Sequence, residues 1–152
     1  MISRRKPKRD DRHIFSMIQE ALVPYTRRSF PDFKLKRKEV HYRLSKARTW
    51  CIRPDKRHCR GFISYIVRGK QLWIDMLAID RQYRRKGWGA KLLDQAERRA
   101  RLNSCSEILL YVDETNIKAQ RFYMYHGYYP LNHDSKLKCY LYVKQVKQVK
   151  QV

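Results

Sequence analysis

The stretch that decides the fold is Tyr83-Arg84-Arg85-Lys86-Gly87-Trp88-Gly89-Ala90-Lys91-Leu92-Leu93. An apolar run at residues 71–79 precedes it and predicts a strand, and apolar residues at helical spacing over residues 87–102 predict the helix that it opens. A helix N-terminus attracts anions, because its first N–H groups have no partners within the helix. The two glycines let these amides approach phosphate oxygens closely, so the stretch predicts a phosphate-binding turn.

Two well-known phosphate-binding patterns do not match this turn. A dinucleotide-binding turn of the Rossmann type needs a third glycine, but Leu92 stands three residues after Gly89. A P-loop needs Gly-Lys followed by Ser or Thr, which the sequence lacks. The turn therefore belongs to another class of phosphate site.

The rest of the chain predicts one domain over residues 1–143. Periodicity and turn residues predict strands at residues 2–5, 49–53, 61–67, 108–112 and 137–143, a helix from Asp10-Asp11 to just before Pro24, a helix starting at Pro31-Asp32, and a helix at residues 117–125. This order indicates an α/β fold with one mixed sheet and helices on both faces. Residues 144–152 are three copies of Lys-Gln-Val, a period that suits neither a strand nor a helix, and we expect a disordered tail there.

Charge is the most unusual feature of the composition. The 152 residues contain 36 Lys and Arg against 14 Asp and Glu, a net charge of +22. Such a surface favours anionic partners, including nucleic acid and phosphorylated cofactors, although it could serve solubility alone. With 43% hydrophobic and 12% aromatic residues the chain is too apolar to be disordered. It has neither a signal peptide nor a run of about 18 apolar residues, so we expect a cytoplasmic protein without a membrane segment.

Metal binding is not predicted. The cysteines form no Cys-x-x-Cys pair, and the five histidines have no metal-ligand spacing such as His-x-x-x-His. We therefore expect buried, reduced thiols and ordinary surface or core histidines.

The turn resembles the acetyl-CoA motif of the GNAT N-acetyltransferases, Arg/Gln-x-x-Gly-x-Gly/Ala. A second element, Asn116-x-x-Ala119-x-x-Phe122-Tyr123-x-x-x-Gly127-Tyr128, is similar to another signature of that family. Gly61-Phe62 also matches, so the resemblance covers at least residues 61–128. It implies the GNAT (acyl-CoA N-acyltransferase) fold and transfer of an acetyl group from acetyl-CoA to a primary amine by direct attack, without an acyl-enzyme.

The resemblance also implies roles for individual residues. The strand end would pair with the pantetheine arm, the backbone N–H groups of the turn would hold the pyrophosphate, and Tyr123 would protonate the leaving thiolate as general acid. The residues implied to bind the cofactor are Leu77, Ala78, Ile79, Arg84, Arg85, Lys86, Gly87, Trp88, Gly89, Ala90 and Asn116.

The general base is left open by the sequence. Some family members carry a Glu on the strand before the turn, and others carry one on the strand before the Asn. Trp73 and Tyr111 stand at those two positions here. Asp75 and Glu114 are the nearest candidates, together with Asp113, and a chain of water molecules could equally remove the proton.

Two classes of function remain in competition. One is an acetyltransferase acting on a protein N-terminus, a lysine or a small-molecule amine, as a monomer or a homodimer. The other is a nucleic-acid- or ribosome-associated binding protein that uses the same scaffold with weak or lost catalysis. The turn together with Asn116 and Tyr123 favours the enzyme, because a binding protein has no need of these residues.

Overall fold

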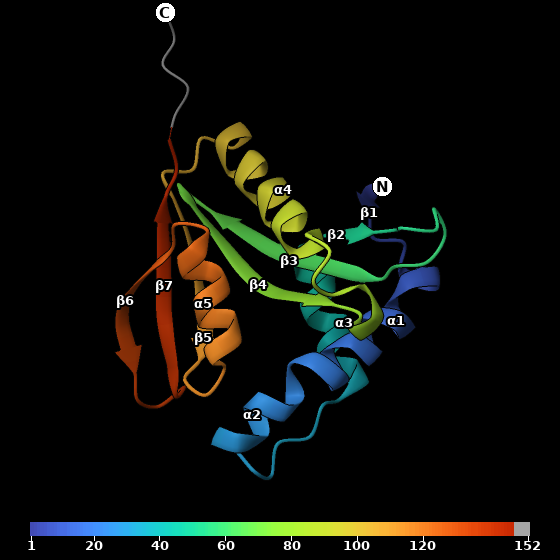
Figure 1. Cartoon of the computed structure of the whole chain (residues 1–152), viewed down its shortest axis with the longest axis horizontal. Helices are drawn as coiled ribbons and strands as arrows, with labels where there is room; N and C mark the ends of the chain where they lie inside the picture. Colours follow the sequence, from blue (N-terminus) through green and yellow to red (C-terminus); the bar gives the residue numbers. More distant parts are fainter. Residues whose placement is uncertain (148–152) are drawn as a thin grey trace, which may run out of the picture.

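Seven strands form one mixed sheet in the computed structural model, which describes residues 1–147 (Figure 1). The strand order is β1-β2-β3-β4-β5-β7-β6. The elements in chain order are β1 (Ile2–Arg4), α1 (Pro7–Ala21), α2 (Val23–Ser29), α3 (Arg37–Lys46), β2 (Arg48–Ile52), β3 (Gly61–Arg68), β4 (Gln71–Ile79), the 3-10 turn η1 (Arg81–Tyr83), α4 (Trp88–Leu102), β5 (Glu107–Asp113), α5 (Ile117–Tyr125), β6 (Tyr129–Asp134) and β7 (Cys139–Gln145). The predicted mixed sheet is confirmed.

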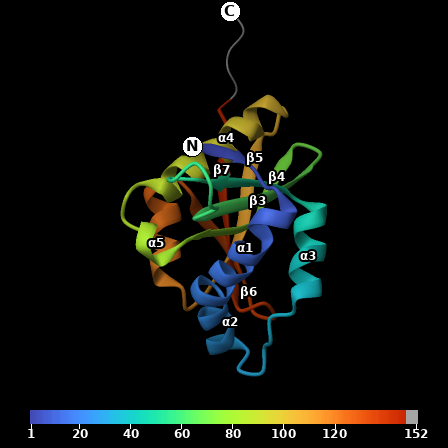
Figure 2. The ribbon, with the colours of Figure 1, turned by 90° about the vertical axis from the view of Figure 1, so that its right-hand side faces the viewer.

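The helices cover both faces of the sheet, as the sequence predicted. Figure 2 shows α5 and α3 on opposite sides of the strands. On one face, α1, α2 and α3 bury Ile14, Val23 and Leu44 against β3 and β4. On the other face, α4 buries Leu92 and Ala96 in a second core, which also contains residues of α5. Each helix therefore buries the apolar stripe that its sequence periodicity displays.

Three helices in the first half of the chain differ from the prediction. α1 begins at Pro7, with Lys6 as its N-cap, so Asp10 and Asp11 lie inside the helix and not at its start. The first predicted helix does end before Pro24, but α2 follows at once, with Pro24 in its first turn. Proline is tolerated there because its missing N–H would have no helical partner. The next helix begins at Arg37 and not at Pro31, since residues 31–36 form a turn and an irregular segment.

The end of the chain also differs from the prediction. β6 was not predicted, because five of its six residues are exposed and no buried alternation marks it. β7 extends to Gln145, so the first two residues of the expected tail pair with β5. The Lys144 ammonium donates to Glu97 and to the His126 carbonyl, each at 2.8 Å. The expectation of a disordered tail is therefore wrong for these two residues, and residues 148–152 lie outside the described part.

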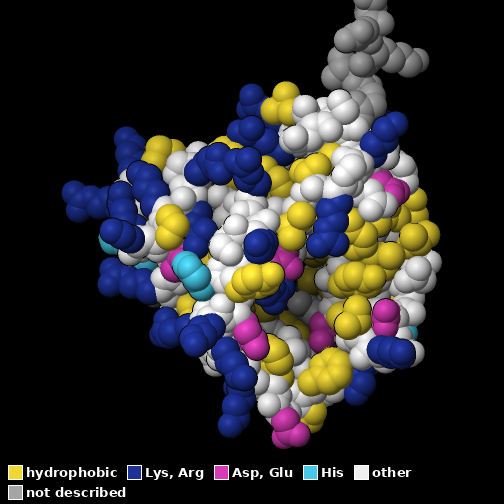
Figure 3. Space-filling model, turned by 180° about the vertical axis from the view of Figure 1, so that it is seen from behind, with side chains coloured by type: hydrophobic (Ala, Val, Ile, Leu, Met, Phe, Trp, Pro, Cys, Tyr) yellow, Lys and Arg dark blue, Asp and Glu magenta, His cyan; other side chains and the backbone are white. Residues whose placement is uncertain are grey.

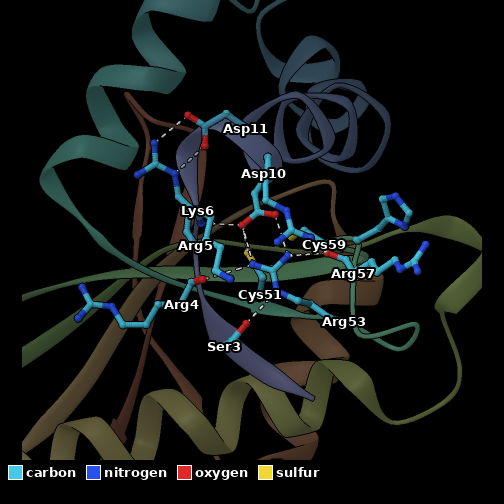
Figure 4. A network of polar contacts seen from close by, with 12 residues as sticks. Ser3, Arg4, Arg5, Lys6, Asp10, Asp11, Cys51, Arg53, Arg57 and Cys59 are labelled. Atoms are coloured by element: carbon cyan, nitrogen blue, oxygen red, sulfur yellow. Dashed lines mark hydrogen bonds and ion pairs between the residues drawn. The ribbon is translucent and has the colours of Figure 1, made fainter.

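A buried ion pair fastens β1, α1 and β2 together (Figure 4). The guanidinium of Arg53, next to the end of β2, donates to both carboxylate oxygens of Asp10 in α1, at 2.7 and 2.6 Å. It also donates to the Ser3 hydroxyl and to the carbonyls of Arg4 and Arg57, so its donors are well satisfied. Asp10 is 1% exposed and Arg53 is 2% exposed.

The cysteines lie mostly inside the two cores. Cys51, Cys59 and Cys105 are buried and Cys139 is half-buried, and none forms a disulfide within residues 1–147. A hydrogen bond with the neighbouring Cys59 and burial raise the pKa of the Cys51 thiol, which keeps it protonated. Cys51 thus behaves as a small core residue.

The two middle strands of the sheet separate from each other. β4 pairs with β5 only from Gln71–Glu107 to Trp73–Leu109, although β4 continues to Ile79 and β5 to Asp113. β5 turns instead to β7, with which it pairs along its whole length. The result is a V-shaped opening between β4 and β5, visible in Figure 1, with its vertex beside Trp73.

Candidate active site

A β-bulge lies on the β4 side of the V. Ile74 pairs with Tyr65 and Met76 pairs with Ser64, so Asp75 has no partner in β3. The bulge reverses which residues face each core, because Ile74 lies in the core of α4 whereas Met76 and Ala78 lie in the core of α1. Bulges of this kind redirect side chains near functional sites.

The turn that follows β4 delivers the N-terminus of α4 to the open end of the V. Asp80 caps the short turn η1 by accepting from the Gln82 N–H. Arg85 and Gly87 then adopt positive φ angles of 62° and 79°. Gly87 is the N-cap of α4 and provides no side chain for its first turn. The first N–H groups of α4 therefore have no side-chain cap, which is the arrangement that binds an anion.

The charges around this turn are not equivalent. Arg84 donates to the Ile79 carbonyl at 3.0 Å and forms an ion pair with Glu20, so it ties the turn to α1. Arg85, Lys86 and Lys91 form no ion pair within residues 1–147. These three side chains are exposed, and they supply the positive potential around the turn.

Gly89 stands in the first turn of α4 and faces α5. A Cβ atom there would meet the ring of Phe122 at 3.4 Å, which is an ordinary van der Waals contact. Gly89 is therefore not required by local packing.

Tyr123 lies between α5 and the sheet, in the core that contains α4. Its ring contacts Phe122 and Tyr128 edge to face, at centroid distances of 5.1 and 5.5 Å. Its side chain is 5% exposed, and burial raises the pKa of its hydroxyl well above the usual value. The phenol is thus held in its protonated form, as a proton donor must be.

Asn116, which is predicted to bind the cofactor, also has a structural role. Its side-chain oxygen caps α5 by accepting from the Ala119 N–H at 3.1 Å. Asp113 shapes the same turn by accepting from the N–H and the hydroxyl of Thr115. The amide nitrogen of Asn116 donates no hydrogen bond within residues 1–147, so it is available to contact a ligand.

The three candidate bases are in different situations. Asp75 is bound by both arms of the Arg43 guanidinium, at 2.8 and 3.1 Å, which neutralises its charge. The Asp113 carboxylate is engaged in the turn before α5, where it accepts hydrogen bonds from the N–H and the hydroxyl of Thr115. Glu114 contacts the His133 Nε2 at 2.7 Å, and both side chains are about one third exposed.

His133 was missed by sequence reasoning, which treated all five histidines as ordinary. It lies on β6, nineteen positions after Glu114, and its ring also contacts Tyr140 at 4.8 Å. No local spacing could reveal this pair, because hairpin pairing of β6 with β7 brings it to the end of β5.

Aromatic side chains occupy the vertex of the V. Trp73 on β4 and Tyr111 on β5 stack with centroids 5.9 Å apart and an angle of 26° between the rings. They lie on the face opposite α4, next to Leu109, Leu141 and Val143. Figure 3, which views the molecule from behind, shows apolar side chains over the half with β5 to β7 and basic ones over the helical half. A hollow separates the halves, and both acidic and basic side chains lie around it.

Two features are absent from residues 1–147. These residues contain no group of three or more His, Cys, Asp or Glu side chains placed to hold a metal ion. No helix within this range is long and apolar enough to cross a membrane.

Comparison with known proteins agrees with this geometry. The structure is similar to the crystal structure of the ribosomal-protein-S18-alanine N-acetyltransferase from Escherichia coli, with a TM-score of 0.77 at 14% identity over 99% of this chain and 96% of that one. It is also similar to a GNAT family acetyltransferase from Elizabethkingia anophelis with acetyl-CoA bound, with a TM-score of 0.76 at 9% identity over 95% of this chain and 97% of that one.

Sequence comparison identifies the family. The uncharacterized protein YdhI from Bacillus subtilis (strain 168) is 34% identical over 68 residues, which are 45% of this chain. The matched part spans 41% of that relative's own length. The model of the acetyltransferase (GNAT) family matches residues 15–128, which include the turn at residues 83–90 and Tyr123. The chain therefore belongs to the acetyltransferase (GNAT) family.

Proposed function

We propose that this protein is an N-acetyltransferase that transfers an acetyl group from acetyl-CoA to a primary amine. The observation that carries the proposal is the position of the α4 N-terminus, which is uncapped at Gly87 and lies at the open end of the V between β4 and β5. A phosphate-binding turn beside an unpaired strand edge suits a ligand with phosphates at one end and a peptide-like arm at the other.

The residues present fit acetyl-CoA. The backbone amides from Arg84 to Ala90 would hold its pyrophosphate, with charge added by Arg85, Lys86 and Lys91. The β4 backbone at Leu77 and Ala78 would pair with the pantetheine arm, whereas the Ile79 carbonyl already accepts from Arg84. When bound, acetyl-CoA supplies an acetyl group activated as a thioester.

Tyr123 has the properties of the proton donor to the departing sulfur. Because burial disfavours the phenolate, the hydroxyl keeps its proton at neutral pH. We infer that it acts first by donating a hydrogen bond that stabilises charge on sulfur as the thioester opens.

The Glu114–His133 pair is the better candidate for the base. It is exposed enough to meet an amine or a bridging water, and its carboxylate can stabilise the protonated imidazole. Asp75 is already committed to Arg43, which favours a structural role that holds α3 against β4. Trp73 and Tyr111 stand at the two positions where other family members carry a Glu, so neither position supplies a carboxylate at the vertex of the V.

The acceptor enters from the face opposite α4. The acidic side chains beside the hollow in Figure 3 can attract an amine, even in a chain with a net charge of +22. The similarity to the S18-alanine N-acetyltransferase makes a protein N-terminus one class of acceptor to test, beside lysine side chains and small-molecule amines.

An acetyl-transfer screen tests the proposal. Released CoA is measured with a thiol reagent for peptides with different N-terminal residues, for lysine peptides and for small amines, with acetyl-CoA alone as the control for hydrolysis. We expect release above the control with one of these classes. Binding of acetyl-CoA without transfer to any class would support the binding-protein alternative.

A further inference from the structure

A second cavity lies far from the phosphate turn, at the opposite end of α4. It has a volume of about 510 Å³, is open to solvent and is lined by the ends of α3 and α4 and by β1, β2 and β3. Arg99 is ten residues beyond Gly89 on α4, and a helix rises about 1.5 Å per residue, so the two places are roughly 15 Å apart along the helix. The side chains that matter are Arg4, Lys46, Arg48, Trp50, Tyr65 and Arg99.

The lining of this cavity, which we call the basic cavity, is strongly positive. Four of its side chains are cationic, and none of the described residues that line it is an Asp or a Glu. Within residues 1–147 none of the four forms an ion pair with a carboxylate. The C-termini of α3 and α4 also point here, but each contributes only about half a negative charge, which leaves a clear positive excess.

Arg99 is held in place by an aromatic ring. Its guanidinium carbon lies 4.6 Å from the centroid of the Trp50 ring, and that of Arg4 lies 6.0 Å from the same centroid. The Trp50 Nε1 donates to the Tyr65 hydroxyl at 3.2 Å, which fixes the ring. The stack therefore positions a cation at a fixed place and neutralises none of its charge.

Arg99 also has a donor without an acceptor. Its Nε atom is buried and has no hydrogen-bond partner within the described residues. A buried polar group without a partner costs stability, so such groups call for an explanation. Its burial keeps Nε itself away from a ligand, but the terminal nitrogens of the same guanidinium also donate no hydrogen bond within residues 1–147, and they remain available to an anion in the basic cavity.

We propose that the basic cavity binds the phosphate group of a phosphate ester. Guanidinium groups match phosphate oxygens with paired hydrogen bonds, and positioned arginines lose little freedom when they bind. This site is separate from the turn that would hold the cofactor, and binding there requires no catalysis. The ester is either a small phosphorylated compound or a nucleic-acid strand, which share this chemistry.

Titration with tripolyphosphate tests the site. The full chain is first saturated with CoA, which occupies the turn at Gly87, and heat is then measured at low salt. We expect one bound tripolyphosphate per chain, and we expect Arg99→Gln to weaken it about tenfold or more, as for the loss of a charged hydrogen bond. Arg48→Gln should also weaken it and leaves the stack of Trp50 and Arg99 intact.

Arg98→Gln is the matched control, because Arg98 is an exposed residue of the same helix outside the basic cavity and loses the same charge. Its effect should stay within about twofold, the general effect of one exposed charge. Absence of binding by the wild type would overturn the proposal. Equal weakening by Arg98→Gln, Arg48→Gln and Arg99→Gln would do the same, since it would reveal only net charge.

A short single-stranded oligouridine distinguishes the two sources of phosphate. Competition with tripolyphosphate and loss of binding in Arg48→Gln and Arg99→Gln would assign the basic cavity to nucleic acid. Tripolyphosphate binding that depends on Arg99 while oligouridine binding does not would assign the basic cavity to a small phosphorylated compound.

Discussion

Replacing Asp10 by Asn should destabilise the protein strongly. The substitution keeps the shape of the side chain but places an amide N–H₂ against the guanidinium of Arg53, which already donates to both Asp10 oxygens. With Asp10 at 1% and Arg53 at 2% exposure, the lost partner leaves a buried charge uncompensated. Removing one member of such a pair costs about 3–5 kcal/mol in the free energy of unfolding.

Asp11→Asn is the matched control in the same helix. Asp11 is also bound by both arms of an arginine, Arg5, at 2.6 and 2.8 Å, but its side chain is 27% exposed. Solvent screening reduces the value of such a pair to about 0–1 kcal/mol. At roughly 2–4 °C of Tm per kcal/mol for a chain of this size, Asp10→Asn should lower Tm by about 6–20 °C and Asp11→Asn by at most about 4 °C.

The effect should depend on pH. Burial alone would raise the pKa of Asp10, but hydrogen bonds from Arg53 and from the Lys6 N–H outweigh it and hold the pKa below its usual value. Since the folded pKa is lowered, the stabilisation is complete above the unfolded pKa of about 3.9 and is lost as pH falls through the folded value.

Urea unfolding followed by circular dichroism at several pH values measures both effects. The difference in unfolding free energy between the wild type and Asp10→Asn should be largest near neutral pH and should shrink in acid. Equal, small losses for Asp10→Asn and Asp11→Asn at pH 7 would refute the reasoning that burial sets the strength of the pair.

Two further predictions concern catalysis, and both are measured with an acceptor found by the screen. Tyr123→Phe should lower turnover by roughly 10- to 1000-fold with little change in acetyl-CoA binding, because a proton donor acts mainly in the transition state. If the variant instead turns over at the wild-type rate, water and not Tyr123 donates the proton. Glu114→Gln should lower turnover by roughly 100-fold or more and alter the pH–rate profile, whereas Asp75→Asn should cost much less, and the reverse order would make Asp75 the base.

The elements with strong local signals could be predicted from the sequence. The helix at residues 117–125 agrees with α5 because Asn116 caps its start and Gly127, with a φ of 90°, follows its end. The strand at residues 71–79 agrees with β4 because its burial alternates along its whole length. The resemblance to the family likewise rested on residues close together in the chain.

The elements and contacts that were missed depend on distant residues. β6 is mostly exposed and is held by its pairing with β7, which no pattern within residues 129–134 reveals. The Arg43–Asp75 and Glu114–His133 pairs join separate elements. Only the fold therefore shows that Asp75 is bound by an arginine and that Glu114 has a histidine partner. The basic cavity combines residues from β1, α3, β2, β3 and α4, with the same consequence.

Acetyl-CoA binding by Gly89 variants tests the central claim most directly. A carboxylate in the first turn of α4 interacts favourably with the helix dipole, so Gly89→Glu should fold, while its charge opposes the phosphates that the turn would hold. Gly89→Ala is the control, because its methyl group fits against Phe122 at 3.4 Å. In isothermal titration we expect the wild type and Gly89→Ala to bind acetyl-CoA with similar affinity and Gly89→Glu to show no binding. Wild-type affinity in a folded Gly89→Glu protein would contradict the assignment of this turn as the cofactor site.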